Sequence, residues 1–285
     1  MTSYAYQRSG APREGFTLVE LLVVIAIIGI LSSAALVAVV AARKFVTGAT
    51  ARVRLDDIAQ AVEMYKQKYG EYPPDSAATD AEIRSHVLKR WKNALKSGVF
   101  NRKDADGNVL MFKIVRDNYA KGDGYPLLFW LAGPDGEGFG LDDADPFCID
   151  SDGPREEPMI ELTYDSDPDG SGGGNYNDEG FMYKGMPIVY FRAHAKSGYD
   201  GKDYHSHGRG EAAPYMNGGV WYNSDSFQLI LPGEDGLFGD DPYGDDEHHG
   251  DYVARDLKDS STFTTADRDN ITNFSNGATI GDDIE

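Results

Sequence analysis

One stretch near the N-terminus constrains the fold of this chain more than any other feature. Residues 16–40 are almost entirely apolar and contain a single charged side chain, Glu20. As an α-helix this segment extends about 37 Å, which is enough to cross a hydrocarbon core of about 30 Å. Because a lone carboxylate in that core costs several kcal/mol, Glu20 is predicted to have a cationic partner or a specific function.

The partner that the sequence offers is a new amino terminus. Cleavage between Gly15 and Phe16 leaves an α-ammonium group four positions before Glu20, on the same face of the helix. Within one subunit this spacing is imperfect for an ion pair. Between staggered neighbours in a bundle, the ammonium of one subunit neutralises the carboxylate of the next. Glu20 is therefore predicted to set the register between subunits.

These residues closely resemble the prepilin cleavage and methylation motif of type IV pilins and type II secretion pseudopilins. The resemblance comprises a basic leader with Arg8 and Arg13, Gly15 at the cleavage position, Phe16 after it, and Glu20 as the fifth mature residue before a long apolar run. It implies that a membrane enzyme, the prepilin peptidase, cuts after Gly15 and methylates the amino group of Phe16.

Two ordinary alternatives compete with this interpretation. A secretory signal peptide has a basic start, a short apolar stretch and a small-residue cleavage site, for which Ser33-Ala34-Ala35 qualifies. A plain signal anchor is the other. Glu20 argues against both, because a charge within the apolar region weakens insertion by about 2.5–3.5 kcal/mol without any benefit to such a segment.

Charge and topology place the rest of the chain. Arg8 and Arg13 precede the apolar span, so the positive-inside rule puts that end in the cytoplasm and the remainder in the periplasm, anchored in the inner membrane. The formal net charge of −20 excludes non-specific nucleic-acid binding as the main role. The single cysteine, Cys148, excludes an internal disulfide.

Four segments are predicted along the chain: a leader at 1–15, a transmembrane and assembly helix at 16–40, an amphipathic continuation of that helix at 41–74, and a periplasmic globular domain at 75–285. The apolar stripe of the continuation recurs at spacings of three and four, in Leu55, Ile58, Val62, Tyr65 and Tyr69. Gly70 and the pair Pro73-Pro74 then end the helix. Residues 65–73 also resemble the end of the long helix in major pseudopilins.

The predicted fold class is α+β, with the long N-terminal helix packed on a small antiparallel sheet and with long acidic, Gly-rich loops. A second helix is predicted at 81–97. Strands are predicted at 125–131, 187–193 and 226–231, because each run is aromatic or β-branched and bounded by Gly or Pro.

Two acidic turns look like copies of each other and are candidate calcium sites. The second, after residue 231, resembles the calcium loop of type II secretion major pseudopilins, and the resemblance matches Asp235 to the first acidic ligand and Asp269 to the closing one. Asp240 or Asp241 is the alternative closing ligand. The first copy offers Asp135, Asp142 and Asp143. Spaced Asp residues in a Gly-rich turn suit Ca²⁺, which prefers carboxylate and carbonyl oxygens.

A third candidate calcium segment has Asp165, Asp167, Asp169 and Gly170 at positions 1, 3, 5 and 6 of an EF-hand loop. Position 12 is Tyr176 instead of the bidentate Glu, so a complete EF-hand is not expected, and a flexible acidic linker remains the alternative. The whole stretch from Asp225 to Glu285 carries 16 acidic against three basic residues.

An enzymatic function is not predicted. Four of the six histidines form two short groups, His205 with His207 and His248 with His249, that lack the companion residues of a catalytic zinc motif. The chain has no nucleophile elbow and no phosphate-binding loop. Cys148 lies between Phe147 and Ile149 and is predicted to be a buried, inert thiol.

The sequence therefore predicts a structural subunit that resembles a major pseudopilin of a type II secretion system. The resemblance implies a homopolymer, with the prepilin peptidase, the inner-membrane secretion platform and minor pseudopilins as partners. A type IV pilin of a surface filament is the alternative within the class. A membrane-anchored, calcium-dependent binding protein is the alternative outside it.

Overall fold

The computed structural model of the chain consists of two compact units, Met1–Thr47 and Gly48–Glu285. It describes residues 17–94, 102–103, 105–107, 109–119, 125–134, 136–148, 153–160, 182–183, 186–194, 198–199, 205–206, 210–239 and 254–284. The predicted leader and the cleavage residues Gly15 and Phe16 lie outside these ranges.

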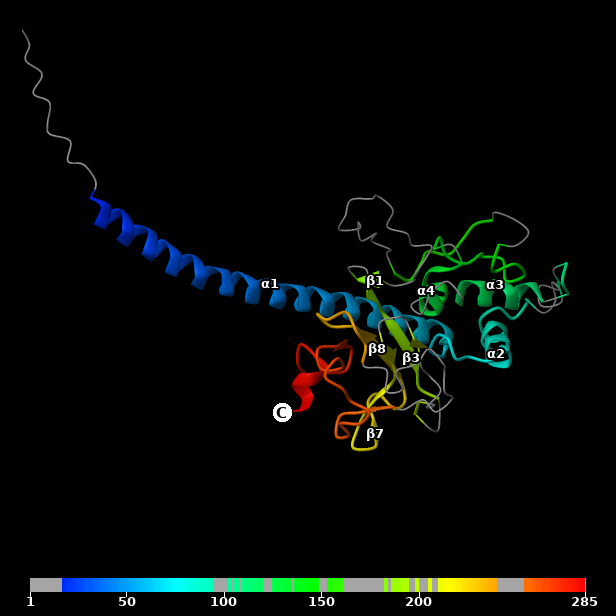
Figure 1. The fold of residues 1–285 in the computed structure, drawn as a ribbon. Coiled ribbons are helices and arrows are strands. Elements are labelled where there is room, and N and C mark those ends of the chain that lie inside the picture. The colour runs from blue at the N-terminus through cyan, green and yellow to red at the C-terminus, as the bar shows by residue number, and fades with distance from the viewer. Residues whose placement is uncertain are drawn as a thin grey trace, which may run out of the picture. The chain divides into compact units, whose positions relative to one another are not determined.

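Helix α1, Leu18–Tyr69, is 52 residues long and contributes to both units (Figure 1). The predicted long helix is therefore present. It ends where the sequence predicts, because Gly70 has a φ of 85° and its N–H donates to the carbonyl oxygen of Lys66 at 2.7 Å. That left-handed conformation is accessible to glycine at little cost, and it terminates the helix.

The central sheet of the second unit has the strand order β10-β8-β3, formed by Ile271–Thr272, Phe227–Leu231 and Val189–Arg192. Both pairings are antiparallel, with Val189 opposite Ile230. The strands predicted at 187–193 and 226–231 are thus confirmed as the adjacent strands β3 and β8. A short β-hairpin, β1 at Met182–Tyr183 and β2 at Met186–Pro187, precedes them.

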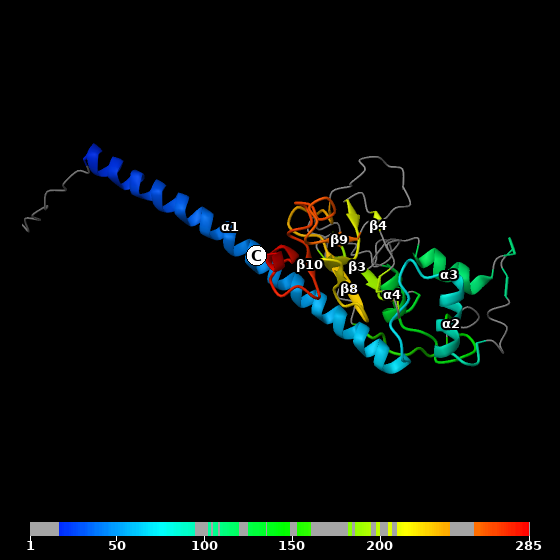
Figure 2. The ribbon, with the colours of Figure 1, turned by 90° about the horizontal axis from the view of Figure 1, so that it is seen from below.

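Both faces of this sheet are buried, because its side chains alternate between two hydrophobic clusters. Tyr190, Leu229 and Leu231 pack in the same cluster as the α1 stripe, whose Leu55, Ile58, Val62 and Tyr65 are fully buried. Val189, Phe191 and Ile230 belong to the other cluster, together with Tyr215, Phe238 and Phe263. Figure 2 shows β8 and β3 beside the second half of α1, and the red C-terminal end also lies next to that helix.

The C-terminal layer contains a second small sheet of order β7-β6-β9, with β6 at Tyr215–Asn217, β7 at Val220–Trp221 and β9 at Arg255–Asp256. The β6–β9 pairing is parallel. Strands β4, His205–Ser206, and β5, Glu211–Ala212, form a separate pair, and the 3₁₀ helix η2 spans Ile280–Ile284. Arg52 of α1 anchors this layer, since its Nη2 donates to the carbonyl oxygen of Ser275 at 2.7 Å.

Three shorter helices lie beside the end of α1: α2 at Asp80–Arg90, α3 at Leu110–Tyr119 and α4 at Tyr125–Ala132. Helix α2 confirms the helix predicted at 81–97 but ends earlier, where the N–H of Trp91 donates to the carbonyl oxygen of Val87. Helix α3 was not predicted.

The strand predicted at 125–131 is wrong, because these residues form helix α4. All eight residues of α4 are buried, so the segment has neither the two-residue nor the 3.6-residue alternation that would distinguish strand from helix. Pro126 in the first turn is compatible with a helix start, where its missing N–H leaves no intrahelical bond unmade.

Candidate functional site

The N-terminal end of α1 is closed by a reciprocal pair of residues, Thr17 and Glu20. The backbone N–H and the hydroxyl of Thr17 donate to Oε2 of Glu20 at 2.9 and 2.8 Å, and the N–H of Glu20 donates to the Thr17 hydroxyl oxygen at 3.2 Å. This arrangement is a capping box, which satisfies N–H groups that have no partner inside the helix.

The capping box gives Glu20 a partner that sequence reasoning missed. The expectation was a cationic partner, and the signal for the alternative was the Thr-x-x-Glu spacing itself. The Glu20 carboxylate can both cap the helix and bind a second donor, because its two oxygens have more acceptor sites than the capping bonds use. Gly15 and Phe16 lie outside the described residues, so the predicted pairing with an α-ammonium group stays a prediction.

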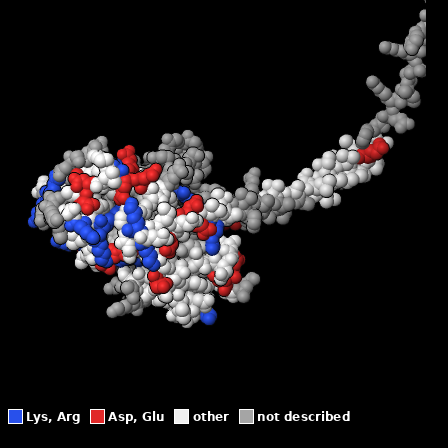
Figure 3. Space-filling view, turned by 180° about the vertical axis from the view of Figure 1, so that it is seen from behind, with Lys and Arg blue, Asp and Glu red and all other residues white. Residues whose placement is uncertain are grey.

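The described surface of α1 that follows Glu20 is apolar. The large hydrophobic side chains from Leu18 to Leu31 are 42–78% exposed. In Figure 3 this part of α1 is uncoloured except for acidic atoms near its N-terminal end, whereas basic and acidic side chains intermix over the second unit. A helix that is apolar all round is stable only when lipid or other protein covers it.

The second candidate site is the turn after β8, at residues 232–239, which the structure brings against Asp269. The N–H of Asp235 donates to Oδ2 of Asp269 at 3.1 Å, while Oδ1 of Asp235 accepts from the N–H of Leu237 at 2.8 Å. Gly233 permits this approach, because a Cβ at that position would overlap the Asp269 carboxylate. The backbone of Asp235 therefore contacts the Asp269 carboxylate, 34 residues away in sequence, which the family resemblance predicts as the closing ligand.

The Asp269 carboxyl has the properties of a cation ligand. Its Oδ1 is buried, and no hydrogen-bond donor of the described residues reaches it. Burial raises the pKa of Asp269, the N–H of Asp235 opposes that rise, and the nearby Asp235 carboxylate adds to it. A hard cation would satisfy the bare oxygen and remove the repulsion between the two carboxylates.

Two carboxylates alone do not complete a calcium shell. Within the described residues, His, Cys, Asp and Glu side chains form no group of three or more suited to a metal ion. Asp240 and Asp241, the other ligands predicted for this turn, lie outside the described residues. The set present fits calcium in chemistry, and the missing ligands would have to come from backbone carbonyls, water or that neighbouring acidic segment.

The other predicted metal residues are not brought together in the described part of the chain. Asp142 accepts from the N–H of Ala144 at 2.8 Å within its own turn, and Asp143 accepts from the Asn93 amide at 3.5 Å. Four of them lie outside the described residues: Asp135, Asp165, Asp167 and Asp169. The same holds for His207, His248 and His249, for which no metal site is predicted. Cys148 is of intermediate burial, so the prediction that it is buried is wrong.

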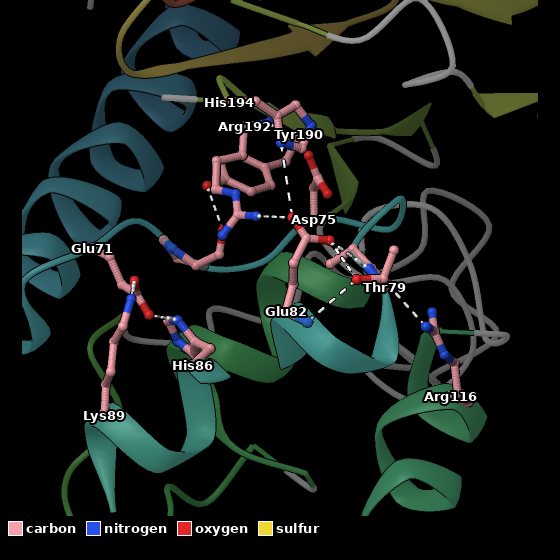
Figure 4. A network of polar contacts seen from close by, with 12 residues as sticks. Glu71, Asp75, Thr79, Glu82, His86, Lys89, Arg116, Tyr190, Arg192 and His194 are labelled. Carbon is pink, nitrogen blue, oxygen red and sulfur yellow. Dashed lines mark hydrogen bonds and ion pairs between the residues drawn. The ribbon is translucent and has the colours of Figure 1, made fainter. Parts of the chain in front are cut away.

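A polar network near the end of α1 was not predicted (Figure 4). His86 of α2, which is 2% exposed, contacts the Tyr65 hydroxyl through Nε2 at 2.6 Å and the Glu71 carboxylate through Nδ1 at 2.6 Å. Lys89 also pairs with Glu71. Burial opposes ionisation of Glu71, but its bonds to His86 and Lys89 outweigh burial and lower its pKa to about 2.

Burial lowers the pKa of His86, although the Glu71 carboxylate opposes this shift. The neutral ring fits its surroundings, because Nδ1–H donates to Glu71 and Nε2 accepts from Tyr65. The sequence signal was available: His86 lies three residues after Ile83 and next to Val87, both on the buried face of α2. The pattern predicts burial of such a histidine but not its partners.

The same network ties α2 to the sheet. The buried Asp75 accepts from the N–H of Arg192 at 3.0 Å, and the Arg192 guanidinium lies 3.6 Å from the Glu82 carboxylate. Glu82 also completes a second capping box with Thr79 at the start of α2. These contacts join side chains from α2, β3 and the segment after α1, and they indicate a structural clamp.

Comparison with known proteins identifies the N-terminal site. Residues 11–36 match the family model described as the prokaryotic N-terminal methylation motif. The chain therefore carries a prepilin motif, which is the substrate of a prepilin peptidase. That motif is the one of type IV pilins and pseudopilins, and it indicates a type IV pilin-like or pseudopilin protein anchored through its N-terminal segment.

The match covers the predicted cleavage residues and Glu20 and does not extend into the second unit. No curated protein and no solved structure matches the chain. In the part of the chain that the structure describes, no helix is both long and apolar enough to qualify as a membrane span.

Proposed function

We propose that this protein is a structural subunit of a type II secretion pseudopilus, which polymerises through its N-terminal helix and supports protein export. The observation that carries the proposal is the apolar start of α1, where the large hydrophobic side chains from Leu18 to Leu31 are exposed around one carboxylate. Such a surface needs lipid before assembly and neighbouring helices after it. A prepilin motif at the same place supplies the class of protein.

The prepilin motif and the charge distribution indicate the order of processing, membrane insertion and assembly. The prepilin peptidase removes residues 1–15 and methylates Phe16. The mature chain waits in the inner membrane as a single-pass protein, with its second unit in the periplasm. It then leaves the membrane by joining a homopolymer, aided by the inner-membrane secretion platform and minor pseudopilins. This role requires no catalysis by the subunit.

Two observations favour a secretion pseudopilin over a type IV pilin. Residues 65–73 at the end of α1 resemble the corresponding segment of major pseudopilins. The turn at 232–239 resembles their calcium loop, and here it lies against the predicted closing ligand Asp269, with the N–H of Asp235 bonded to its carboxylate. The type IV pilin remains the second candidate, because the methylation motif is common to both.

Calcium binding is part of the proposal. Asp235 and Asp269 would hold the ion, with Asp240 or Asp241 as a further carboxylate. Calcium would satisfy the bare Oδ1 of Asp269 and neutralise an acidic C-terminal region whose mutual repulsion opposes folding. An ion that binds only the folded loop stabilises it by about 2.7 kcal/mol at a hundredfold excess over Kd.

Glu20→Leu tests the assembly role. The variant removes the costly charge from the apolar segment, so membrane insertion should be at least as efficient while filament yield falls strongly. Glu20→Asp, which keeps the charge on a shorter side chain, is the matched control and should retain part of the yield. Filaments are quantified after shearing, and insertion by membrane fractionation. A wild-type yield from Glu20→Leu contradicts the proposal.

Deletion of the gene distinguishes the two candidate machines. Loss of one or more exported proteins from the medium, with surface filaments unchanged, supports a secretion pseudopilus. Loss of surface filaments with normal export identifies a type IV pilin instead.

A further inference from the structure

One side chain holds both ends of the turn at residues 232–239. Asn270 is fully buried. Its Oδ1 accepts a hydrogen bond from the N–H of Gly233 at 3.2 Å, and its Nδ2 donates to the carbonyl oxygen of Phe238 at 2.6 Å. A single amide group therefore bridges the start and the end of the turn that carries Asp235.

Asn270 is itself fixed by neighbours outside the turn. Its Nδ2 also donates to the Tyr215 hydroxyl at 2.8 Å, and that hydroxyl donates to Oδ1 of Asp267 at 3.0 Å. The backbone oxygen of Asn270 accepts from the N–H of Ile280 at 2.8 Å. These partners leave one orientation for the amide, because its oxygen faces a donor and its nitrogen faces two acceptors.

The last residue of the turn is confined as well. Gly239 lies so close to the buried pair of Arg255 and Asp267 that an added Cβ would be 2.8 Å from a polar atom of each. The Arg255 Nε lies 3.5 Å from the Asp267 carboxylate, and both side chains are almost completely buried. The turn is thus bounded by a rigid polar core on the side away from solvent.

The position of Asn270 also affects the two acidic residues, Asp235 and Asp269. Asp269 is the neighbour of Asn270 in sequence, and its Oδ2 accepts from the N–H of Asp235. The position of Asn270 relative to Gly233 and Phe238 therefore sets how closely Asp235 approaches Asp269. We propose that Asn270 is a positioning residue, which holds this turn in a shape competent for a hard divalent cation before any cation binds.

This inference rests on the proposed calcium binding and adds a residue that does not itself coordinate the ion. A site ordered in advance binds more tightly, because the cation does not have to order the chain. Loss of Asn270 should therefore reduce calcium affinity and not stability alone. Replacement of a residue that orients metal ligands typically weakens metal binding by about 10–100-fold.

The test uses the full-length protein in detergent, with calcium chloride as the probe. Calcium affinity is measured by titration calorimetry, and the melting temperature is measured in chelator and in millimolar calcium at constant ionic strength. Asn270→Ala is expected to weaken calcium binding by at least about tenfold and to shrink the calcium-induced rise in melting temperature.

Asn273→Ala is the matched control. The Asn273 Oδ1 accepts from the N–H of Leu229 at 2.8 Å, so this variant also removes an amide that bonds the backbone, but at strand β8 instead of at the turn. It is expected to lower the melting temperature in chelator and to leave calcium affinity within about twofold of wild type, well below the loss typical of a ligand-orienting residue.

If Asn270→Ala does not fold, Asn270→Ser replaces it, because a hydroxyl reaches one end of the turn but cannot bridge both. Wild-type affinity in a folded Asn270 variant, with or without a lower melting temperature, overturns the positioning role alone. An equal loss of affinity in Asn273→Ala also overturns it. Absence of calcium binding in the wild type overturns the calcium proposal together with this inference.

Discussion

Replacing Arg90 by Met is expected to destabilise the second unit more than any exposed charge change on α2. The Arg90 side chain is 3% exposed, and its Nη2 lies 2.5 Å from Oε1 of Glu156. The same nitrogen donates to the Tyr69 hydroxyl at 2.8 Å, while Nη1 donates to the Tyr65 hydroxyl at 3.1 Å. One guanidinium thus links α2 to the last turns of α1 and to the segment that carries Glu156.

Aromatic rings surround the same guanidinium. Its carbon lies 4.0 Å from the Tyr69 ring centre, 4.1 Å from that of Phe139 and 4.3 Å from that of Trp91. Removing one partner of a buried ion pair costs about 3–5 kcal/mol, because the remaining charge stays buried. Glu156 is 19% exposed and also bonds to Lys68, so the lower end, about 3 kcal/mol, is expected.

Urea unfolding of the full-length protein in detergent, followed by tryptophan fluorescence, measures this loss. Lys89→Met is the matched control, because Lys89 is adjacent in sequence and paired with Glu71, but its side chain is 58% exposed. It should cost at most about 1 kcal/mol. Arg90→Lys should recover less than half of the loss, since an ammonium group lacks the planar fork. Equal costs for Arg90→Met and Lys89→Met would refute this reasoning.

The remaining predictions concern acid, calcium and the helix start. Because burial lowers the pKa of His86, the unfolded state binds a proton that the folded state resists. The free energy of unfolding should be constant above about pH 6.5 and should fall below that pH by at most about 1.4 kcal/mol per pH unit. Chemical denaturation at a series of pH values measures this slope. The same slope in His86→Gln would show that His86 is not its source. Asp235→Ala should abolish most of the calcium-induced rise in melting temperature, and magnesium should replace calcium poorly. Replacement of the exposed Asp259 by Ala is the control. A full calcium response in Asp235→Ala contradicts the proposed site. Thr17→Val should cost about 1 kcal/mol at the start of α1, seen as faster hydrogen exchange of first-turn amides, and unchanged exchange would exclude the capping box.

Sequence reasoning predicts best where a segment carries a local signal, such as a helical stripe, a run of aromatic and β-branched residues, or a terminating glycine. The stripe from Leu55 to Tyr65 faces the sheet as expected, and strands β3 and β8 pair where the sequence places strands. Gly70 ends α1 because few other residues adopt its φ. Each of these features has a local signal that tertiary contacts then reinforce.

The same reasoning fails where the local signal fits helix and strand equally well, or where the partners of a residue are remote in sequence. Helix α4 is buried on every side, so its sequence lacks the alternation of apolar and polar residues that distinguishes a helix from a strand. Arg90 and Glu156 are 66 residues apart and meet only in the folded chain. Because most charged residues are exposed to solvent, the sequence gives no reason to expect this pair to be buried. The pairing of Asp235 with Asp269 was found through family resemblance. The Asn270 bridge was missed, because an asparagine after an aspartate suggests only a turn.

Mass spectrometry of the mature N-terminus tests the central claim most directly. The protein is purified from cells with and without the prepilin peptidase, and its N-terminal peptide is sequenced. We expect a terminus at Phe16 carrying one N-methyl group when the peptidase is present, and the uncut leader when it is absent. A mature terminus after Ala35, or a leader retained in both strains, would contradict it.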